Sequence, residues 1–404
     1  METKLVMVLG EEVGKGFYGY VLTVIKKIIK KTSKVFFIYI IFENFEKSNF
    51  TFFIFYIFIV LKTFSTARWK HSSADTMASD APSDSAAGTV AAEKEEEIEI
   101  DAPGFFRLYK NGRFVRLIGT ERMSASLDPS TGVDSKDVLV DPSSGVSVRL
   151  YLPPVSPTRK LPVLVYFHGG AFCLESAASP IYHRHLNTLA SRTPLLVVSV
   201  DYRLAPEHPL PTAYEDSWTA LRWVFSSPFP DQWIADYGDL TRVFLAGDSA
   251  GANIAHHLAL RGRKETEAGI AIKGVLLIHP YFWGTDPIGS ESADPTFRSH
   301  INKIWQLTCP DTTGPDDPRL NPFTDEAKSL KELGCDRLLV TIAEKDLMRN
   351  RGRAYYDKVK ESGWAGEAEL HEMPDAEHVF HLFHPDTEKA DEQIRLFVDF
   401  FNKE

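Results

Sequence analysis

The sequence predicts an α/β protein in which helices cover both faces of a mostly parallel sheet. The first observation is a series of short apolar runs rich in Val and Ile, as buried parallel strands are. The second is that segments with apolar residues at helical spacing lie between these runs. The third is the length of 404 residues, which suffices for one large domain with a full core or for two average domains.

The composition excludes several classes of protein. A net charge of -10 argues against nucleic acid as the main partner, because phosphate binding needs a basic surface. The cysteines Cys173, Cys309 and Cys335 are too few for a disulfide framework and form no C-x-x-C pair. We therefore expect neither a disulfide scaffold nor a metal site.

Residues 1–76 differ sharply in composition from the rest of the chain. They hold 11 of the 27 Phe and none of the 24 Pro, and their 11 Lys+Arg against 6 Asp+Glu give a net charge of +5. The apolar runs 35–42 and 50–61 are shorter than the roughly 18 to 20 residues of a membrane-spanning helix. The segment does not fit a secretory signal either, because its charged and apolar parts come too late and in the wrong order.

Phe, Ile, Lys, Asn and Tyr are encoded by A/T-rich codons, so we interpret residues 1–76 as a translated non-coding extension, with Met77 as the true start. The alternative is a weak membrane anchor or an organelle presequence. With this segment set aside, no targeting signal remains, and we expect a cytoplasmic protein.

Residues 77–100 are small, polar and acidic. They cannot bury enough apolar area to offset the entropy lost on ordering, so we expect a disordered acidic lead-in. From about residue 101 strand and helix patterns alternate, and we expect residues 101–404 to form the α/β domain.

Predicted strands and helices alternate along this part of the chain. Between two of the strands, apolar residues recur at helical spacing and define one helix face: Tyr214, Trp218, Leu221 and Val224. In parallel sheets the chemistry lies at the carboxyl ends of the strands, so the candidate side chains are those that follow a predicted strand. The predicted strands span residues 146–152, 163–167, 195–200, 243–246, 275–278, 338–342 and 368–373.

The first candidate is Ser249 in Gly247-Asp248-Ser249-Ala250-Gly251, between a predicted strand and a helix. The small flanking residues permit a sharp turn that lifts the serine hydroxyl clear of the sheet. The helix N-terminus supplies backbone N–H groups for developing negative charge. This context favours a nucleophile, and the alternative is a glycine-lined turn with an incidental serine.

A second motif, His168-Gly169-Gly170-Ala171-Phe172, follows the predicted strand 163–167. Glycines let backbone N–H groups approach an oxyanion, so we expect Gly169 and Gly170 to act as donors together with the N–H of Ala250. The alternative is a turn that needs glycine only for its positive φ angles. We expect His168 to hold the loop by hydrogen bonds and not to act as a base.

A serine nucleophile needs a base that is itself oriented by an acid. Asp346 follows one predicted strand and is the expected acid, with Glu344 as the alternative. His378 follows the last predicted strand and is the expected base, with His381 and His384 as competitors.

Three further residues are weaker candidates. His256 and His257 lie on the helix after the serine, so we interpret them as ordinary helix residues. Cys173 lies close to the glycine motif but has no base of its own, so we interpret it as a packing residue.

Taken together, these motifs resemble the hormone-sensitive-lipase-type group of α/β-hydrolases and, within it, the plant carboxylesterases, from about residue 101 to 400. The resemblance implies an eight-stranded α/β-hydrolase fold with a helical cap, hydrolysis of carboxylic esters and no cofactor. The motifs that carry it are His168-Gly169-Gly170, Asp201-Tyr202-Arg203-Leu204-Ala205-Pro206-Glu207, Gly247-Asp248-Ser249-Ala250-Gly251, Phe106-Arg107-Leu108-Tyr109-Lys110-Asn111-Gly112, Glu344-Lys345-Asp346 with Arg351-Gly352, and Ser362-Gly363-Trp364.

The resemblance also implies a cap made by the N-terminal segment and a later insertion. We expect it from about residues 101–130 and from residues 283–322, which are rich in Pro, Asp, Gly and aromatics, as an irregular insertion is. A pocket there favours small or medium acyl esters. Its walls, unless they are plain core, are Phe105, Phe106, Phe282, Trp283 and Trp305.

Two relatives within this group offer other functions. Gibberellin receptors bind a hormone without hydrolysing it and carry a non-histidine at the position of His378. In 2-hydroxyisoflavanone dehydratases a threonine often replaces the nucleophile, whereas this chain has Ser249. Both residues favour the esterase. Ala171 stands where many relatives have a third glycine, and its backbone N–H would be kept if that position were a donor.

Overall fold

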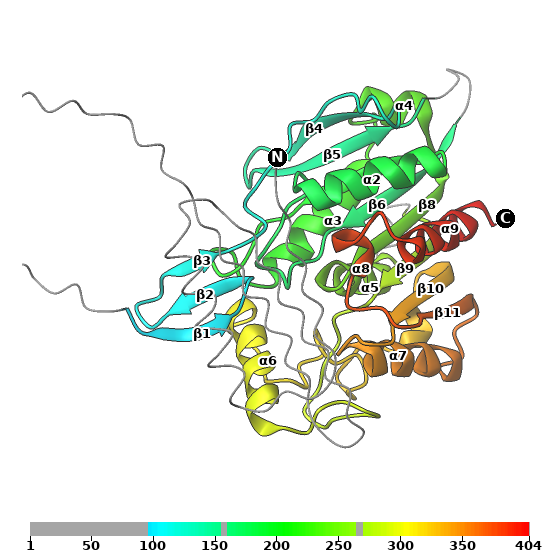
Figure 1. Cartoon of the computed structure of the whole chain (residues 1–404). Helices are drawn as coiled ribbons and strands as arrows, with labels where there is room; N and C mark the ends of the chain where they lie inside the picture. The colour runs from blue at the N-terminus through cyan, green and yellow to red at the C-terminus, as the bar shows by residue number, and fades with distance from the viewer. Residues whose placement is uncertain (1–95, 155–159, 264–269, 404) are drawn as a thin grey trace, which may run out of the picture. The chain divides into compact units, whose positions relative to one another are not determined.

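An eight-stranded sheet in the order β11-β10-β9-β8-β6-β7-β5-β4 forms the centre of the computed structural model (Figure 1). Strands β6 to β11 run parallel to one another, and β5 pairs antiparallel with both β7 and β4. This sheet confirms the predicted α/β class. Its strands are β4 (Asp134–Asp141), β5 (Val146–Leu152), β6 (Leu161–Phe167), β7 (Leu196–Asp201), β8 (Gly238–Asp248), β9 (Ile272–Ile278), β10 (Cys335–Ala343) and β11 (Glu367–Met373).

Helices cover both faces of the sheet. One apolar cluster joins α2 and α9 to one face, and a second joins α3, α5 and α7 to the other (Figure 1). The helices of the main layer are α2 (Pro180–Arg192), α3 (Thr212–Val224), α4 (Gln232–Tyr237), α5 (Ala250–Gly262), α7 (Arg349–Glu361), α8 (Phe380–Phe383) and α9 (Glu388–Asn402), with a 3-10 turn at η2 (Leu330–Glu332).

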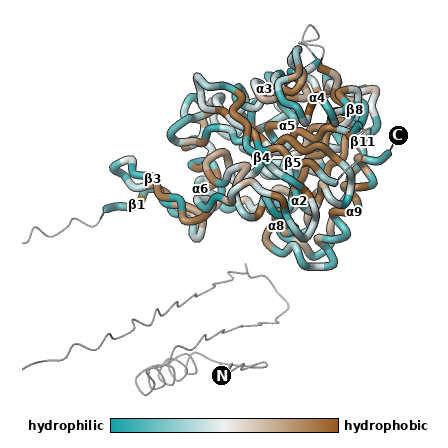
Figure 2. Tube along the Cα trace, turned by 90° about the horizontal axis from the view of Figure 1, so that it is seen from above, coloured by the Kyte–Doolittle hydropathy of each residue, from teal (hydrophilic) through white to brown (hydrophobic). Residues whose placement is uncertain are grey.

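The strands between these layers are apolar on both faces. Every residue of β6 is buried: Val163, Val165 and Phe167 pack towards one helix layer, and Leu164 and Tyr166 towards the other. Because successive side chains of a strand point to opposite faces, a sheet covered on both sides needs a continuous apolar run. Figure 2 shows the hydrophobic colour concentrated in the central strands.

Two strands differ from the sequence prediction. The edge strand β4 is absent from the predicted strands, because exposed polar residues such as Asp134 and Asp137 lie on both of its faces and leave no apolar run or alternation. Strand β8 begins earlier than residue 243, since Gly238 and Asp239 already pair with Leu161 and Pro162 of β6.

The structure describes residues 96–154, 160–263 and 270–403, all within the compact unit of residues 92–404. The predictions for residues 1–76 and for most of the acidic lead-in therefore lie outside the described residues. Near residue 100 the prediction of disorder is wrong, because Ile98–Ala102 forms strand β1 and buries Ile100. In the described ranges no helix combines the length and the apolar character needed to cross a membrane.

The two segments expected to form the cap lie against each other. Strand β1 pairs with β2 (Phe106–Tyr109), and β2 pairs with β3 (Phe114–Arg116), all antiparallel. This small sheet packs on α6 (Pro295–Thr308) through an apolar cluster that includes Ile304 and Leu307. The expectation of a helical cap is thus wrong for the N-terminal part, which is a sheet. The later insertion contains a 14-residue helix and is not irregular throughout.

Four of the five aromatic residues offered as pocket walls are buried. Phe106, Phe282, Trp283 and Trp305 are each at most 2% exposed, whereas Phe105 is 47% exposed. Trp283 nevertheless borders a pocket that Phe297 and Asp346 also line.

Candidate active site

Ser249 occupies a sharp turn between β8 and α5. Its backbone has φ 52° and ψ -117°, a left-handed conformation that residues with a side chain rarely adopt. Two hydrogen bonds hold it: its N–H donates to the carbonyl of Ile278 at 2.8 Å, and its carbonyl accepts from the N–H of Tyr281 at 3.0 Å. The serine is therefore fixed, half-buried, at the carboxyl edge of the sheet.

The two glycines of the turn are required by close backbone approach. A Cβ at Gly251 would lie 2.0 Å from the carbonyl oxygen of Phe167, and a Cβ at Gly247 would lie 2.4 Å from the backbone of Gly251. Real Cβ contacts are not that short, so only glycine lets the end of β6 and the serine turn pack together. The G-x-S-x-G spacing is a packing requirement as well as a motif.

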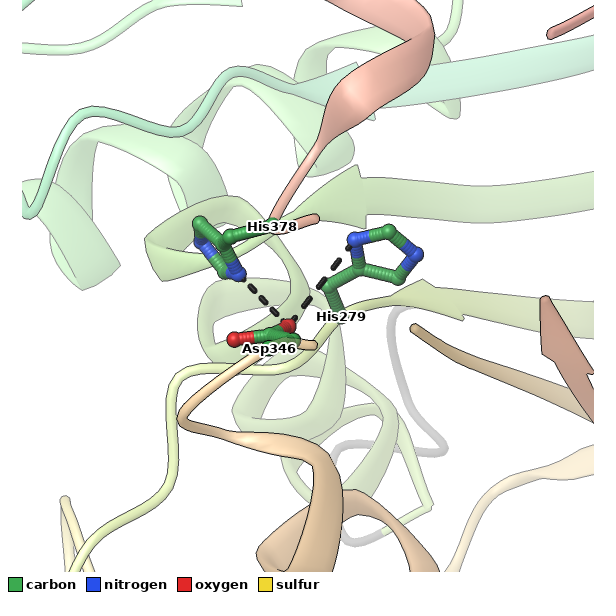
Figure 3. A group of neighbouring side chains, drawn as sticks. All are labelled: His279, Asp346 and His378. Carbon is green, nitrogen blue, oxygen red and sulfur yellow. Dashed lines mark hydrogen bonds and ion pairs between the residues drawn. The ribbon is translucent and has the colours of Figure 1, made fainter. Parts of the chain in front are cut away.

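Asp346 and His378 form a hydrogen-bonded pair at the same edge (Figure 3). Asp346 follows β10, and its side chain has no exposed surface. Its Oδ2 lies 2.7 Å from His378 Nδ1, and its Oδ1 accepts from the N–H of Met348 at 2.8 Å. One carboxylate oxygen is thus held by the backbone, and the other orients the imidazole.

The charges of this pair support each other. Burial alone would raise the pKa of Asp346, but the charge of His378 and the hydrogen bond between them lower it below its usual value. Burial alone would lower the pKa of His378, but Asp346 raises it above its usual value. The arrangement therefore stabilises an imidazolium next to a carboxylate, which is the form that arises when the histidine accepts a proton.

Ser249 lies at the same strand edge as this pair, without a direct hydrogen bond to it. Among the described residues, its hydroxyl makes no hydrogen bond. Burial raises the pKa of Asp248, the residue before the serine, and the charge of His378 acts against this rise. In structures without substrate such catalytic hydrogen bonds are often long and tighten only in the complex.

The other predicted candidates occupy different places. The carboxylate of Glu344 accepts from the N–H of Asp375 at 2.7 Å, so it supports the loop that carries the base. His381 is buried, and His384 is exposed. Burial raises the pKa of the Cys173 thiol to about 12. None of these four candidates hydrogen-bonds to the acid–base pair in the described part of the chain.

One predicted oxyanion donor is already in use. The N–H of Gly169 donates to the hydroxyl of Tyr182 at 2.7 Å, and that hydroxyl donates to Asp248 Oδ2 at 2.8 Å. A backbone N–H bound to a buried tyrosine does not point at a reacting group. The expectation for Gly169 is therefore corrected.

Three other backbone N–H groups at this edge have no partner among the described residues. They belong to Gly170, Ala171 and Ala250. The N–H of Ala250 is free because the first residue of a helix has no intrahelical acceptor. Gly170 has φ 99° and Ala171 has φ 50°, so the loop turns sharply at these two residues.

Asp248 connects the serine turn to the glycine loop. Its two oxygens accept from the hydroxyls of Tyr166, at 2.9 Å, and Tyr182, at 2.8 Å. Burial raises its pKa to about 6. No sequence motif points to these tyrosines, because Tyr166 lies inside β6 and Tyr182 lies on α2.

His168 supports the glycine loop from the opposite side. Its Nδ1 lies 2.8 Å from the carbonyl oxygen of Gly169, and its ring stacks on Tyr202 with centroids 4.1 Å apart. The hydroxyl of Tyr202 donates to the carbonyl of His168 at 2.7 Å. Burial lowers the pKa of His168 to about 4, so the ring is neutral and its contacts stabilise the loop.

A second imidazole, that of His279, lies beside the pair of Asp346 and His378 (Figure 3). The potential ligand atoms of His279, Asp346 and His378 lie within 4.8 Å of one another, as they would in a metal site. However, the Nδ1 of His279 accepts from the N–H of Val379 at 2.8 Å, and that of His378 is bound to Asp346. Because both Nδ1 atoms are already engaged in hydrogen bonds, the arrangement fits an acid–base pair better than a metal centre. His279 follows β9 directly, so the rule that chemistry lies at strand ends could have found it.

Comparisons with known proteins identify the family of this chain. The model of the alpha/beta hydrolase fold family matches residues 164–382. The chain is 46% identical over 309 residues to "Probable carboxylesterase 2" of Arabidopsis thaliana, which covers 76% of this chain and 98% of that protein. It is 44% identical over 316 residues to the 2-hydroxyisoflavanone dehydratase of Glycyrrhiza echinata, with 76% and 96% covered.

Further relatives include the chloroplastic tuliposide A-converting enzyme 1 of Tulipa gesneriana, 46% identical over 312 residues, with 76% of this chain and 78% of that protein covered. Among solved structures, a hyperthermophilic esterase of Pyrobaculum calidifontis is 29% identical, with a TM-score of 0.55 over 66% of this chain and 82% of that one. The chain belongs to the α/β-hydrolase fold family, and within it to the plant carboxylesterase-type group of hydrolases.

Proposed function

We propose that this chain hydrolyses carboxylic esters through an acyl-enzyme formed on Ser249, with His378 as the base and Asp346 as the orienting acid. The observation that carries the proposal is the 2.7 Å bond between His378 Nδ1 and Asp346 Oδ2, at the same strand edge as a serine in a strained turn. A base with a raised pKa, oriented by a buried carboxylate, is what activation of a serine hydroxyl requires.

In the first half of the reaction His378 takes the proton of the Ser249 hydroxyl while its oxygen attacks the ester carbonyl carbon. The bond to the alcohol oxygen then breaks, and the alcohol leaves with the proton from His378. In the second half a water molecule gives its proton to His378 and attacks the acyl carbon. The acid is released, and the serine recovers its proton. Asp346 stabilises the imidazolium in both halves.

The negative charge on the carbonyl oxygen would be held by the free N–H groups of Gly170, Ala171 and Ala250. They support this role because nothing else in the described protein occupies them. Removal of one such donor typically lowers the rate by about 10²- to 10³-fold. This assignment replaces the Gly169 amide, which is bound to Tyr182.

Small or medium acyl esters remain the proposed substrates, and the cytoplasm remains the predicted location. A second candidate function is the elimination of water, because one relative at 44% identity is a 2-hydroxyisoflavanone dehydratase. Formation of the unsaturated product from a 2-hydroxyisoflavanone, measured by liquid chromatography, tests it. The presence of Ser249 favours ester hydrolysis over this alternative.

The test of the esterase compares wild type with Ser249→Ala, using p-nitrophenyl esters of increasing acyl length. We expect the variant to fall to the background rate and the wild type to show an acyl group on Ser249 by mass spectrometry. Ser191→Ala, at an exposed position on α2, is the matched control and should keep full activity. Equal rates for wild type and Ser249→Ala would rule out the proposal.

A further inference from the structure

His279 lies at the carboxyl edge of the sheet, where the proposed triad also lies. It follows β9 directly, while Ser249 follows β8 and Asp346 follows β10. The residue has no exposed surface, and its φ of 47° is left-handed, although it is not a glycine. Its N–H donates to the carbonyl of Thr341 at 2.9 Å. An unfavourable backbone conformation is thus found where it places the ring inside the protein.

The ring of His279 is a fixed hydrogen-bond acceptor and not a second base. Its Nδ1 accepts from the N–H of Val379 at 2.8 Å, so Nδ1 carries no proton. Its Nε2 is buried without a partner among the described residues. Burial lowers the pKa of the ring to about 3, which keeps it neutral.

The acceptor holds the peptide bond directly after the proposed base. That bond joins His378 to Val379, a β-branched residue with φ 45°. Such a conformation is unfavourable for valine, so the loop needs an anchor there. The His279 ring also stacks on Phe380, with centroids 6.0 Å apart, and its Nδ1 lies 3.9 Å from Asp346 Oδ2. A single side chain thus contacts the loop on both sides of its sharpest turn.

We propose that His279 is a positioning residue that sets the orientation of His378 by holding the Val379 N–H. The inference rests on the proposed esterase function. Without this anchor the peptide after the base is free to rotate, and the bond between His378 and Asp346 weakens. A misplacement of about 1 Å in such a group costs roughly 10² in rate.

The pH profile gives a readout that a merely structural role would not move. Asp346 raises the pKa of His378, and the base must be neutral to accept the serine proton. Activity is therefore lost as the pH falls through the pKa of His378. If the anchor is removed and the bond to Asp346 weakens, that pKa falls. The acid limb of kcat/KM then moves to lower pH, while the maximum rate drops.

The variants exploit the geometry of Nδ1. In His279→Asn the amide oxygen sits two bonds from Cβ, as Nδ1 does, and can accept from Val379. In His279→Gln the amide is one bond further out, and in His279→Leu there is no acceptor. His185→Phe is the control. His185 is also a buried imidazole, and it contacts the far side of the His381 ring, but it makes no hydrogen bond to the loop of the base.

The measurement is kcat and KM for p-nitrophenyl acetate across pH, on the full chain, with thermal unfolding as a check of folding. We expect kcat to fall about 10²-fold in His279→Leu and His279→Gln, with KM little changed and the acid limb displaced downwards. His279→Asn should stay within about fivefold of wild type, and His185→Phe should match it. If His279→Leu does not fold, the contrast between Asn and Gln decides.

Two results would overturn the inference: a wild-type rate and pH limb in His279→Gln, or an Asn variant as slow as the Gln variant. The parallel Ser249→Ala measurement separates the two levels. If Ser249→Ala is as active as wild type, the esterase proposal itself fails. If Ser249→Ala is inactive but the His279 variants are unaffected, only the positioning role is wrong.

Discussion

The turn that carries Ser249 and the loop that carries His378 lie at the same edge of the sheet, but they are held in place by different means. The serine turn depends on glycines within two residues of the serine, because the backbone of β6 approaches so closely. The histidine loop is held by Asp346, 32 residues away, and by His279, 100 residues away from the bonded Val379. The serine turn is thus shaped by the glycines beside it and held by backbone hydrogen bonds to Ile278 and Tyr281, whereas the base is held by the side chains of Asp346 and His279.

The two regions also differ in their surroundings. Asp248, beside the serine, is fully buried and bound by two tyrosine hydroxyls. The histidine loop reaches the surface, where Asp375 pairs with Lys345 and Lys389. Such exposed ion pairs add little stability, so we attribute the position of the base mainly to its buried contacts.

The largest expected effect tests the local side of this contrast. In Gly251→Ala the added Cβ would meet the carbonyl oxygen of Phe167 at 2.0 Å, which neither strand nor helix can relieve. We expect a loss of about 3 kcal/mol in the free energy of unfolding, together with loss of activity. Gly262→Ala, at the other end of α5, is the control, because its Cβ would meet only a flexible side chain at 3.3 Å. Chemical denaturation measures both, and equal stability of the two variants would contradict the argument.

The second prediction tests the distant partner of the base. Asp346→Asn should keep the fold but lower kcat by about 10⁴-fold, because an amide cannot hold the imidazole in the required tautomer. Glu344→Gln, two residues earlier, keeps an acceptor for the Asp375 N–H and should remain within a fewfold of wild type. Steady-state rates on a p-nitrophenyl ester distinguish them. A reversed order would make Glu344 the acid.

The smallest effect concerns the link between the two regions. Tyr182→Phe leaves the Gly169 N–H and Asp248 each without one partner, so we expect a stability loss of about 1 to 3 kcal/mol. We also expect kcat to fall by roughly tenfold, because the glycine loop loses its anchor. Tyr166→Phe removes the other bond to Asp248 without touching the loop. It should lose similar stability with an unchanged kcat, and a matching fall in kcat would refute a role for the loop anchor.

The parts of the site that could be predicted are those with local signals. The serine turn, Asp346 and His378 each follow a run of apolar residues, and the strand-end rule selects them. The choice of Asp346 over Glu344 could not be made from the sequence with certainty, because both follow the same strand two residues apart. Only the direction of the two side chains separates them: one bonds to the imidazole and the other to a backbone N–H.

The misjudged parts involve contacts between segments far apart in the chain. The role of Gly169 looked plausible from its place in the motif, but the hydroxyl of Tyr182 on α2 takes its N–H. Likewise, Phe106 and Trp305 were expected as pocket walls. Phe106 is instead buried between the small sheet and α6, and Trp305 belongs to the main core beside Phe172 and Tyr281. Composition shows that a residue is apolar, but not which apolar surface it meets.

Local sequence patterns alone determined most strands of the main sheet, their alternation with helices and the chemical types at the strand ends. These follow from backbone sterics and from the alternation of side chains, which act over a few residues. Only the tertiary structure decided which N–H groups stay free and which imidazole holds the loop of the base. Hydrogen bonds between distant segments have no counterpart in local sequence, because the partner is chosen by how the layers pack.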